Sequence, residues 1–114
     1  MSDTPFTYTS AAGSREGLIV MTLAGPLTLS NMFGFQSELK ATTAPVLLLD
    51  MTQVPYMDSA GLGVLMNYYV AAQSAGRKFV LVGLNDRIGS LLELTGVKDI
   101  LKSYASVAEA EATL

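Results

Sequence analysis

The segment Val46–Gly63, VLLLDMTQVPYMDSAGLG, carries the strongest signals for the fold and for the location of the candidate site. Its first four residues form a continuous apolar run, which is typical of a strand buried on both faces. A short loop follows Asp50, and Asp58 then stands directly before Ser59. The residues after Ser59 open a helical pattern. The segment therefore predicts a strand, a turn, and a helix that begins with a small hydroxyl beside a carboxylate.

The rest of the chain has strand and helix patterns that are joined by short connections. Strands are expected over residues 6–11, 18–23, 46–49, 79–82 and, at an edge of the sheet, 100–102. Helices are expected from Ser30 or Asn31 to about Ala41, from Asp58 to Ala75, from Asn85 or Asp86 to Gly96, and from Ser106 to Leu114. Strands that alternate with helices indicate parallel neighbours, and the first two strands indicate a hairpin. The predicted fold class is α/β, a single domain over residues 1–114 with a mixed four- to five-stranded sheet, an N-terminal antiparallel strand pair and about four helices, mostly on one face.

The composition excludes several kinds of chemistry. The 114 residues include no cysteine and no histidine, which removes disulfides, thiolate catalysis, the usual general base and the commonest metal ligand. Asp50 and Asp58 could suggest a metal pair, but their spacing gives little support, and no glycine-rich loop suggests a bound nucleotide. Ser59 has no basic partner nearby in the sequence, so it is a poor nucleophile. We expect no metal, no cofactor and no enzymatic activity.

Charge and hydropathy predict where the protein works. The net charge is −3, and no basic cluster occurs along the sequence, which argues against nucleic acid as a partner. No apolar run approaches the roughly 20 residues that a membrane span requires. The N-terminal sequence MSDTPFTYTS lacks the basic and apolar regions of a signal peptide. We expect a soluble, cytoplasmic protein that does not insert into a membrane.

The helix predicted over residues 58–75 has two apolar faces. Its core stripe is expected to consist of Leu62, Leu65, Met66, Tyr69 and Val70. Roughly opposite lie Val64, Tyr68, Ala71 and Ala75, where a solvated helix would carry Lys, Glu or Gln. We expect this outer stripe to form a protein-binding patch with Ser59 and Gly63, extended from the loop by Tyr56 and Met57. A neighbouring helix, or a second copy of the chain in a homodimer, could cover the stripe instead.

The order of elements and the sequence MDSAGLG at residues 57–63 resemble the STAS domain family, named for sulphate transporters and anti-sigma factor antagonists. The resemblance covers nearly the whole chain and is closest to the small single-domain bacterial antagonists. Further residues that carry it are Leu23, Gly25 and Leu27 around the second strand, Leu48, Leu49 and Asp50 in the central strand, and Leu91, Leu94, Thr95, Gly96 and Val97 in the late helix and its exit turn.

The resemblance implies a phosphorylation switch. In the family, a partner kinase of the GHKL ATPase type phosphorylates the serine after the signature aspartate, which corresponds to Ser59. The unphosphorylated antagonist binds the anti-sigma factor, often this same serine kinase, and so frees a sigma factor. Phosphorylation breaks the complex and a serine phosphatase restores it. The expected function is therefore that of an anti-sigma factor antagonist, and the expected partner-binding residues are Tyr56, Met57, Asp58, Ser59, Gly61, Gly63, Val64 and Tyr68.

Two positions depart from the family pattern, and the second leaves an alternative open. Ala60 stands where many members carry a second hydroxyl, which sharpens the case for Ser59. Thr28 stands where antagonists often carry an acidic residue, which leaves room for a constitutive accessory subunit of a transporter ATPase or of a signalling scaffold. Locally, Asp58 could be only a helix N-cap. Gly61 and Gly63 could serve close packing of the helix, close approach of a partner, or both.

Overall fold

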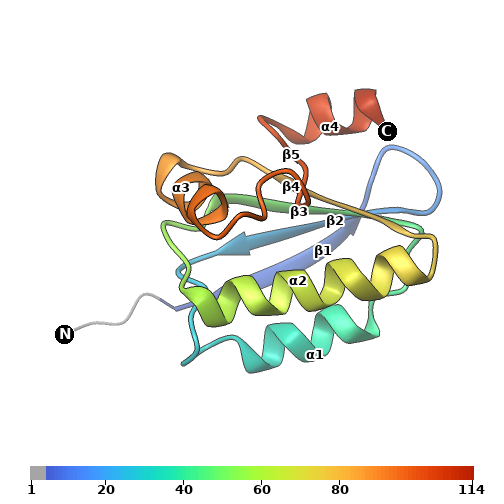
Figure 1. The fold of residues 1–114 in the computed structure, drawn as a ribbon. Helices are drawn as coiled ribbons and strands as arrows, with labels where there is room; N and C mark the ends of the chain where they lie inside the picture. The colour runs from blue at the N-terminus through green and yellow to red at the C-terminus, as the bar shows by residue number, and fades with distance from the viewer. Residues whose placement is uncertain (1–4) are drawn as a thin grey trace.

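The computed structural model describes residues 5–114, and in this part of the chain one five-stranded sheet runs through the molecule (Figure 1). The strands lie in the order β1-β2-β3-β4-β5. β1 is antiparallel to β2, and all other neighbours are parallel. The expected mixed sheet with an N-terminal antiparallel pair is thus confirmed. The strands are β1 Thr7–Ala12, β2 Leu18–Ala24, β3 Val46–Gln53, β4 Lys78–Val82 and β5 Ser103–Tyr104. The domain range and the signal-peptide reading also covered residues 1–4, which lie outside the described part.

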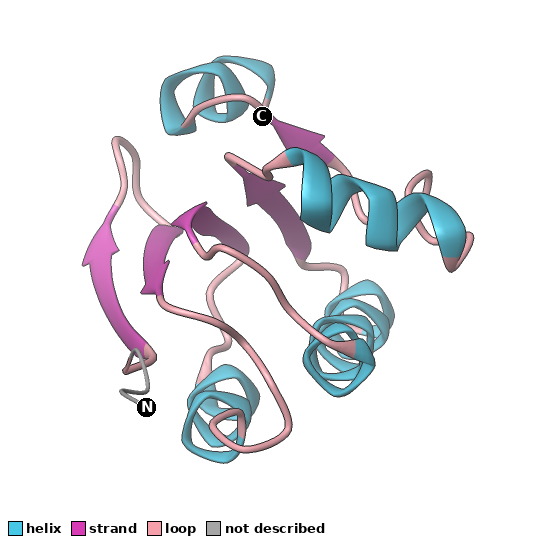
Figure 2. Ribbon diagram, turned by 90° about the vertical axis from the view of Figure 1, so that its left-hand side faces the viewer, coloured by secondary structure: helices cyan, strands magenta, loops and turns pink. Residues whose placement is uncertain are grey.

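Helices cover both faces of the sheet. They are α1 Phe33–Ala41, α2 Ser59–Ser74, α3 Asp86–Leu94 and α4 Val107–Thr113. α1 and α2 lie side by side on one face, and α4 lies on the other (Figures 1 and 2). The larger hydrophobic core includes side chains of α1, α2 and α3, whereas a smaller one lies under α4. Leu47 and Leu49 belong to the first core and Leu48 to the second, so β3 is buried on both faces as its apolar run predicts.

The loops that follow the parallel strands meet at one edge of the sheet. Gly25 turns the chain out of β2 with a φ of 94°, a conformation that side chains with a Cβ rarely adopt. Its amide donates to the carbonyl of Gln53, 3.0 Å away, at the end of β3. The side-chain amide of Asn85, after β4, donates to the carbonyl of Pro55 at 2.9 Å. In such sheets this edge is where binding sites form, and it also holds the turn into α2.

Three predicted details of the elements are wrong. β3 does not end at Leu49 but continues to Gln53, because Gln53 still pairs with Ala24 of β2, so the first residues of the expected loop belong to the strand. The edge strand lies at 103–104 and not at 100–102, because residues before it form a turn in which the Leu101 amide donates to the Val97 carbonyl at 2.9 Å. α1 begins at Phe33 with Met32 at its N-cap and no side-chain cap. Asn31 does not cap this helix, because its side chain is used to close the preceding loop.

Candidate functional site

The site is the turn into α2, and the carboxylate of Asp58 holds it together. Oδ1 of Asp58 accepts a hydrogen bond from the Gly61 amide at 2.9 Å, which caps α2. Oδ2 accepts from the Leu29 amide at 3.1 Å. The backbone amide of Asp58 donates to the Leu27 carbonyl at 3.2 Å. One residue therefore caps the helix and also fixes the loop between β2 and α1 against it.

These hydrogen bonds determine the charge state of Asp58. Partial burial would raise its pKa, but the backbone amides of Gly61, Leu29, Ala60 and Asp58 itself favour the ionised form. Their combined effect keeps the pKa of Asp58 below its usual value of 3.8. The carboxylate is thus ionised throughout the physiological pH range, and a fixed negative charge lies directly before Ser59.

Ser59 is the first residue of α2 and its side chain is exposed. Within residues 5–114, no hydrogen bond of its hydroxyl is found, because Asp58 already provides the helix cap. The hydroxyl is therefore free and faces solvent at the positive end of the helix dipole. A hydroxyl in this position can accept a phosphoryl group without disturbing a hydrogen bond of the fold.

The two glycines of the turn have different roles. A Cβ on Gly61 would lie 2.6 Å from the Leu27 carbonyl oxygen, which is too close for any other residue unless α2 moves. A Cβ on Gly63 would meet nothing within 4 Å, and this residue is exposed. Close packing therefore explains Gly61 but not Gly63, whose bare backbone leaves room on the outer surface of the helix.

The loop between β2 and α1 forms the second wall of the site. The side chain of Asn31 accepts from the Thr28 amide at 2.9 Å and donates to the Pro26 carbonyl at 2.7 Å. Its fixed shape leaves Leu29 56% exposed and Phe33, at the start of α1, 61% exposed. Exposed apolar side chains of this size are candidates for contact with another protein.

Sequence reasoning missed Leu29 and Phe33, although the helical pattern contains a signal for Phe33. Phe33 lies outside the helical stripe of Phe35 and Leu39, the two residues that α1 buries.

Tyr56 was predicted as a surface residue and is exposed. The guanidinium of Arg87 lies 5.0 Å from the centre of its ring, which holds the ring in place by a cation–π contact.

The predicted outer stripe of α2 is wrong for two of its four residues. Val64 and Tyr68 are only 4% and 6% exposed, whereas Val70, predicted in the core, is 58% exposed. The physical reason is that α1 packs against this side of α2. The Tyr68 hydroxyl donates to the Thr42 carbonyl at 3.1 Å, just after α1. Val64 and Tyr68 are therefore not available to a partner in this structure.

Two other predicted contact residues are also buried. Met57, expected to extend the patch from the loop, is buried in the larger core and bridges to Leu27 as an isolated β-pair. Gly61 is buried under the Leu27 carbonyl. The exposed members of the predicted set are Tyr56, Ser59 and Gly63, with Asp58 partly exposed beside them.

The remaining acidic candidate has a structural role. Oδ1 of Asp50 accepts from the Thr52 amide at 3.0 Å and from its hydroxyl at 2.6 Å. Among residues 5–114, no group of three or more acidic, histidine or cysteine side chains could hold a metal ion. Within the same range, none of the helices combines the length and the apolar character needed to cross a membrane.

Residues 10–110 match the STAS domain family, and the chain belongs to that family. Proteins of Listeria monocytogenes and Staphylococcus aureus named anti-sigma-B factor antagonist are similar to part of it. The first is 44% identical over 57 residues, which are 50% of this chain and 50% of the relative. The second is 38% identical over 53 residues, which are 46% of this chain and 49% of the relative. The matched segment spans about half the length of these curated relatives.

Solved structures extend the likeness over the whole fold. An anti-sigma factor antagonist from Mycobacterium paratuberculosis superposes with a TM-score of 0.81 at 19% identity, covering 98% of this chain and 97% of the other. The anti-sigma factor antagonist SpoIIAA in its unphosphorylated form gives a TM-score of 0.74 at 15% identity, covering 91% and 92%. The TM-scores establish a shared fold, and at identities this low they establish the fold alone.

Proposed function

We propose that this protein is a cytoplasmic anti-sigma factor antagonist that is controlled by phosphorylation of Ser59. In its unphosphorylated form it binds an anti-sigma factor that is also a serine kinase of the GHKL ATPase type. Phosphorylation releases it, and a serine phosphatase restores binding. The observation that carries the proposal is the exposed hydroxyl of Ser59, which is free because Asp58 alone caps α2. The names of the Listeria and Staphylococcus relatives support the role of an anti-sigma factor antagonist.

The turn tolerates a phosphate but a docked partner would not. A phosphoserine adds about −1.5 to −2 charge and three acceptor oxygens. The dipole of α2 and its first amides stabilise an anion at this end of the helix, so the fold survives. The same charge would stand beside ionised Asp58 and face any surface docked over the turn. A tenfold loss of affinity needs only about 1.4 kcal/mol.

The surface that the partner covers is defined by exposed residues around the turn. It includes Tyr56, Ser59 and Gly63 from the predicted set, and Leu29 and Phe33 from the neighbouring loop and α1. An apolar partner surface would bury Leu29 and Phe33 and place its backbone close to Gly63. A charge introduced at Ser59 would then lie inside the contact.

The test is capture of partners from lysate of the host, with purified wild type, Ser59→Ala, Ser59→Asp and Ser74→Asp as baits. Ser74 is exposed at the other end of the same helix, so its substitution is the matched control for added charge. We expect wild type, Ser59→Ala and Ser74→Asp to retain a GHKL-type kinase that Ser59→Asp loses. A second arm compares Phe33→Ser, expected to weaken capture, with Val70→Ser, expected to leave it unchanged.

The outcome that contradicts the proposal is equally specific. Equal capture of the same partner by all four baits would mean that Ser59 does not control binding. A transporter ATPase held in that manner would favour the constitutive accessory subunit. Incubation of wild type and Ser59→Ala with the captured kinase and ATP, followed by mass spectrometry, identifies the modified residue directly.

A further inference from the structure

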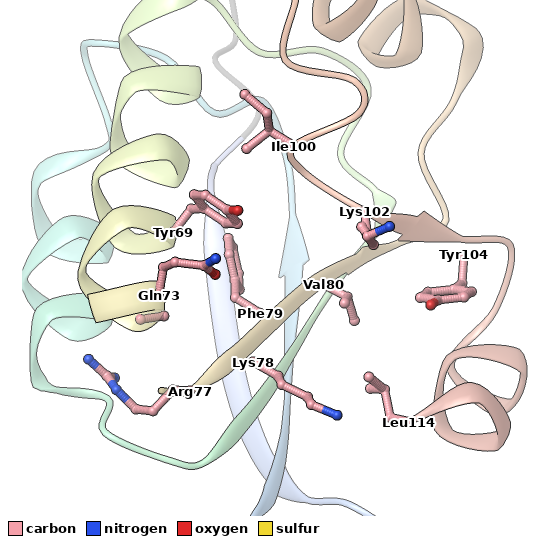
Figure 3. A pocket seen from close by; sticks show the side chains of 11 residues that line it. Tyr69, Gln73, Arg77, Lys78, Phe79, Val80, Ile100, Lys102, Tyr104 and Leu114 are labelled. Atoms are coloured by element: carbon pink, nitrogen blue, oxygen red, sulfur yellow. The ribbon is translucent and has the colours of Figure 1, made fainter. Parts of the chain in front are cut away.

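A second surface feature lies far from Ser59, at the opposite end of α2. It is a groove of about 310 Å³ between the last turns of α2, the start of β4, the segment before β5 and the end of α4 (Figure 3). Gln73 of α2 lines it. Because an α-helix rises about 1.5 Å per residue, Tyr69, the α2 residue of the groove that is nearest to Ser59, is about 15 Å from it along the helix, and Gln73 is about 21 Å from it. The groove is thus separate from the switch.

The floor of the groove is an incomplete sheet edge. β5 pairs only with Leu81 and Val82, so the first half of β4 has no strand beside it on this side among residues 5–114. The Lys78 amide donates to the Pro45 carbonyl toward β3, and the Leu81 amide donates to the Lys102 carbonyl toward β5. Backbone groups alternate in direction along a strand. The amide and carbonyl of Phe79 therefore face the groove.

An open strand edge of this kind favours one type of ligand. Unpaired backbone groups on a sheet edge act as a template for another extended segment. Peptides that bind by strand addition gain affinity from these main-chain hydrogen bonds and specificity from side-chain pockets. Partly exposed side chains of Tyr69, Ile100 and Tyr104 supply apolar walls on either side of Phe79 (Figure 3).

The charge of the groove contrasts with that of the rest of the chain. Arg77, Lys78 and Lys102 line it, and no acidic side chain does. The other four basic and ten acidic residues leave a net charge of −6 elsewhere. Lys78 and Lys102 are exposed, and within residues 5–114 the one ion pair joins Lys98 to Glu93. Arg77 is partly engaged, since its guanidinium donates to the Thr42 carbonyl at 2.8 Å. Two free ammonium groups thus flank the open edge.

We propose that this groove docks an extended acidic segment of a partner protein. The segment adds to the first half of β4 as a short strand, with main-chain hydrogen bonds to Phe79 and carboxylates beside Lys78 and Lys102. The groove, with a volume of about 310 Å³, lies at the lower end of the range for small-molecule sites. Its backbone floor suits a peptide, and its charge selects an acidic one.

The probe that tests this is a fluorescein-labelled ten-residue peptide of alternating valine and glutamate, measured by fluorescence anisotropy at low and at physiological salt. Matched probes are the valine–lysine peptide, and a valine–glutamate peptide with N-methyl groups on every second residue. The double variant Lys78→Glu/Lys102→Glu is compared with Arg15→Glu/Lys40→Glu, which makes the same charge change at exposed positions outside the groove.

We expect the acidic peptide to bind wild type and the control variant alike, and to bind the groove variant about fivefold or more weakly. The lysine and N-methyl peptides should bind less well. In a proton–nitrogen NMR spectrum, the Phe79 amide should shift and exchange more slowly when the acidic peptide is added.

Several results would overturn the proposal. One is that the acidic peptide does not bind wild type at millimolar concentration. A second is that the groove variant binds this peptide as tightly as wild type does. A third is that the N-methyl peptide binds as tightly as the acidic peptide and the Phe79 amide signal does not change. Concentration-dependent association of wild type that Lys78→Glu/Lys102→Glu abolishes, seen by sedimentation, would assign the groove to a second copy of the chain instead.

Discussion

At the scale of single residues, the site depends on how closely α2 approaches the loop that follows β2. Gly61 permits this approach because it has no Cβ to meet the Leu27 carbonyl. Asp58 then fixes it, with one carboxylate oxygen on each side of the contact. Ser59 is left with no structural task, which is what a modifiable residue requires.

The pair of glycines provides a matched test of packing. Gly61→Ala should destabilise the fold by about 1–3 kcal/mol, because the new Cβ has no space beside Leu27. Gly63→Ala should leave stability unchanged or raise it by up to about 1 kcal/mol, since alanine favours the helix and nothing lies nearby. Urea unfolding of both variants gives the two free energies. Equal effects would mean that α2 does not press on the loop as described.

Asp58 predicts a dependence of stability on pH. Its pKa is lower in the folded protein than its usual value of 3.8, so its stabilising contribution is complete above that value. The contribution is lost as the pH falls through the lower, folded-state pKa. Asp58→Ala should cost about 1 kcal/mol at pH 7, whereas Asp58→Asn keeps a capping oxygen and should cost less.

Urea unfolding at pH 7 and at pH 3 checks the sign. The stability difference between wild type and Asp58→Asn should shrink at the lower pH, because there the unfolded chain, with the usual pKa of 3.8, takes up a proton more readily than the folded protein. A difference that grows as the pH falls would contradict the assigned charge state. Amide exchange at Leu29, which donates to Asp58, should quicken in Asp58→Ala.

At the scale of elements, α2 shows both the strength and the weakness of reasoning from sequence. Its bounds, Ser59–Ser74, agree with the expected helix, and Asp58 is its N-cap. The prediction of its buried face was only partly right, because none of its sixteen residues is charged. An apolar pattern on every side cannot select a face, and the burial of Val64 and Tyr68 depends on where α1 packs. That tertiary contact is not encoded in the helix itself.

Tyr68 is therefore predicted to hold elements together and not to bind a partner. Its hydroxyl bonds to Thr42, and its ring packs edge-on against Phe79 with centroids 4.9 Å apart. Tyr68→Phe should cost about 1 kcal/mol of stability, the usual value of one hydrogen bond, with unchanged capture of the partner. Loss of capture without loss of stability would restore the predicted binding role.

The titration of Tyr68 gives an independent check of the same contact. Burial raises the pKa of its phenol, although the charge and hydrogen bond of Arg77 act in the opposite direction. Because this pKa is raised, the contribution of the neutral Tyr68 phenol to stability is complete below the pKa of tyrosine in the unfolded chain. The contribution is lost as the pH rises through the pKa of Tyr68 in the folded protein. Absorbance titration should show one tyrosine that ionises later than the others in wild type and not in Tyr68→Phe.

At the scale of the whole molecule, the sheet brings together what the sequence keeps apart. The order of elements and the central apolar strands were predictable, because hydrophobic patterns and glycine turns are local signals. The junction of Leu29 with Asp58 was not, since it joins residues twenty-nine positions apart. The same holds for Lys78 and Lys102, which do not form a basic cluster along the chain but line one groove. Contacts of this kind depend on strand order, which local patterns do not fix.

The length of α2 has a consequence for how the two surfaces act together. At physiological ionic strength the field of a charge is screened within about 8 Å, while the groove begins at Tyr69, about 15 Å along the helix from Ser59. The charge of a phosphate on Ser59 would therefore have little effect on the binding of a segment docked at Phe79. If Ser59 is phosphorylated as proposed, a protein docked in the groove would stay bound while the phosphate is added and removed, so the same pair could pass through many cycles without dissociating.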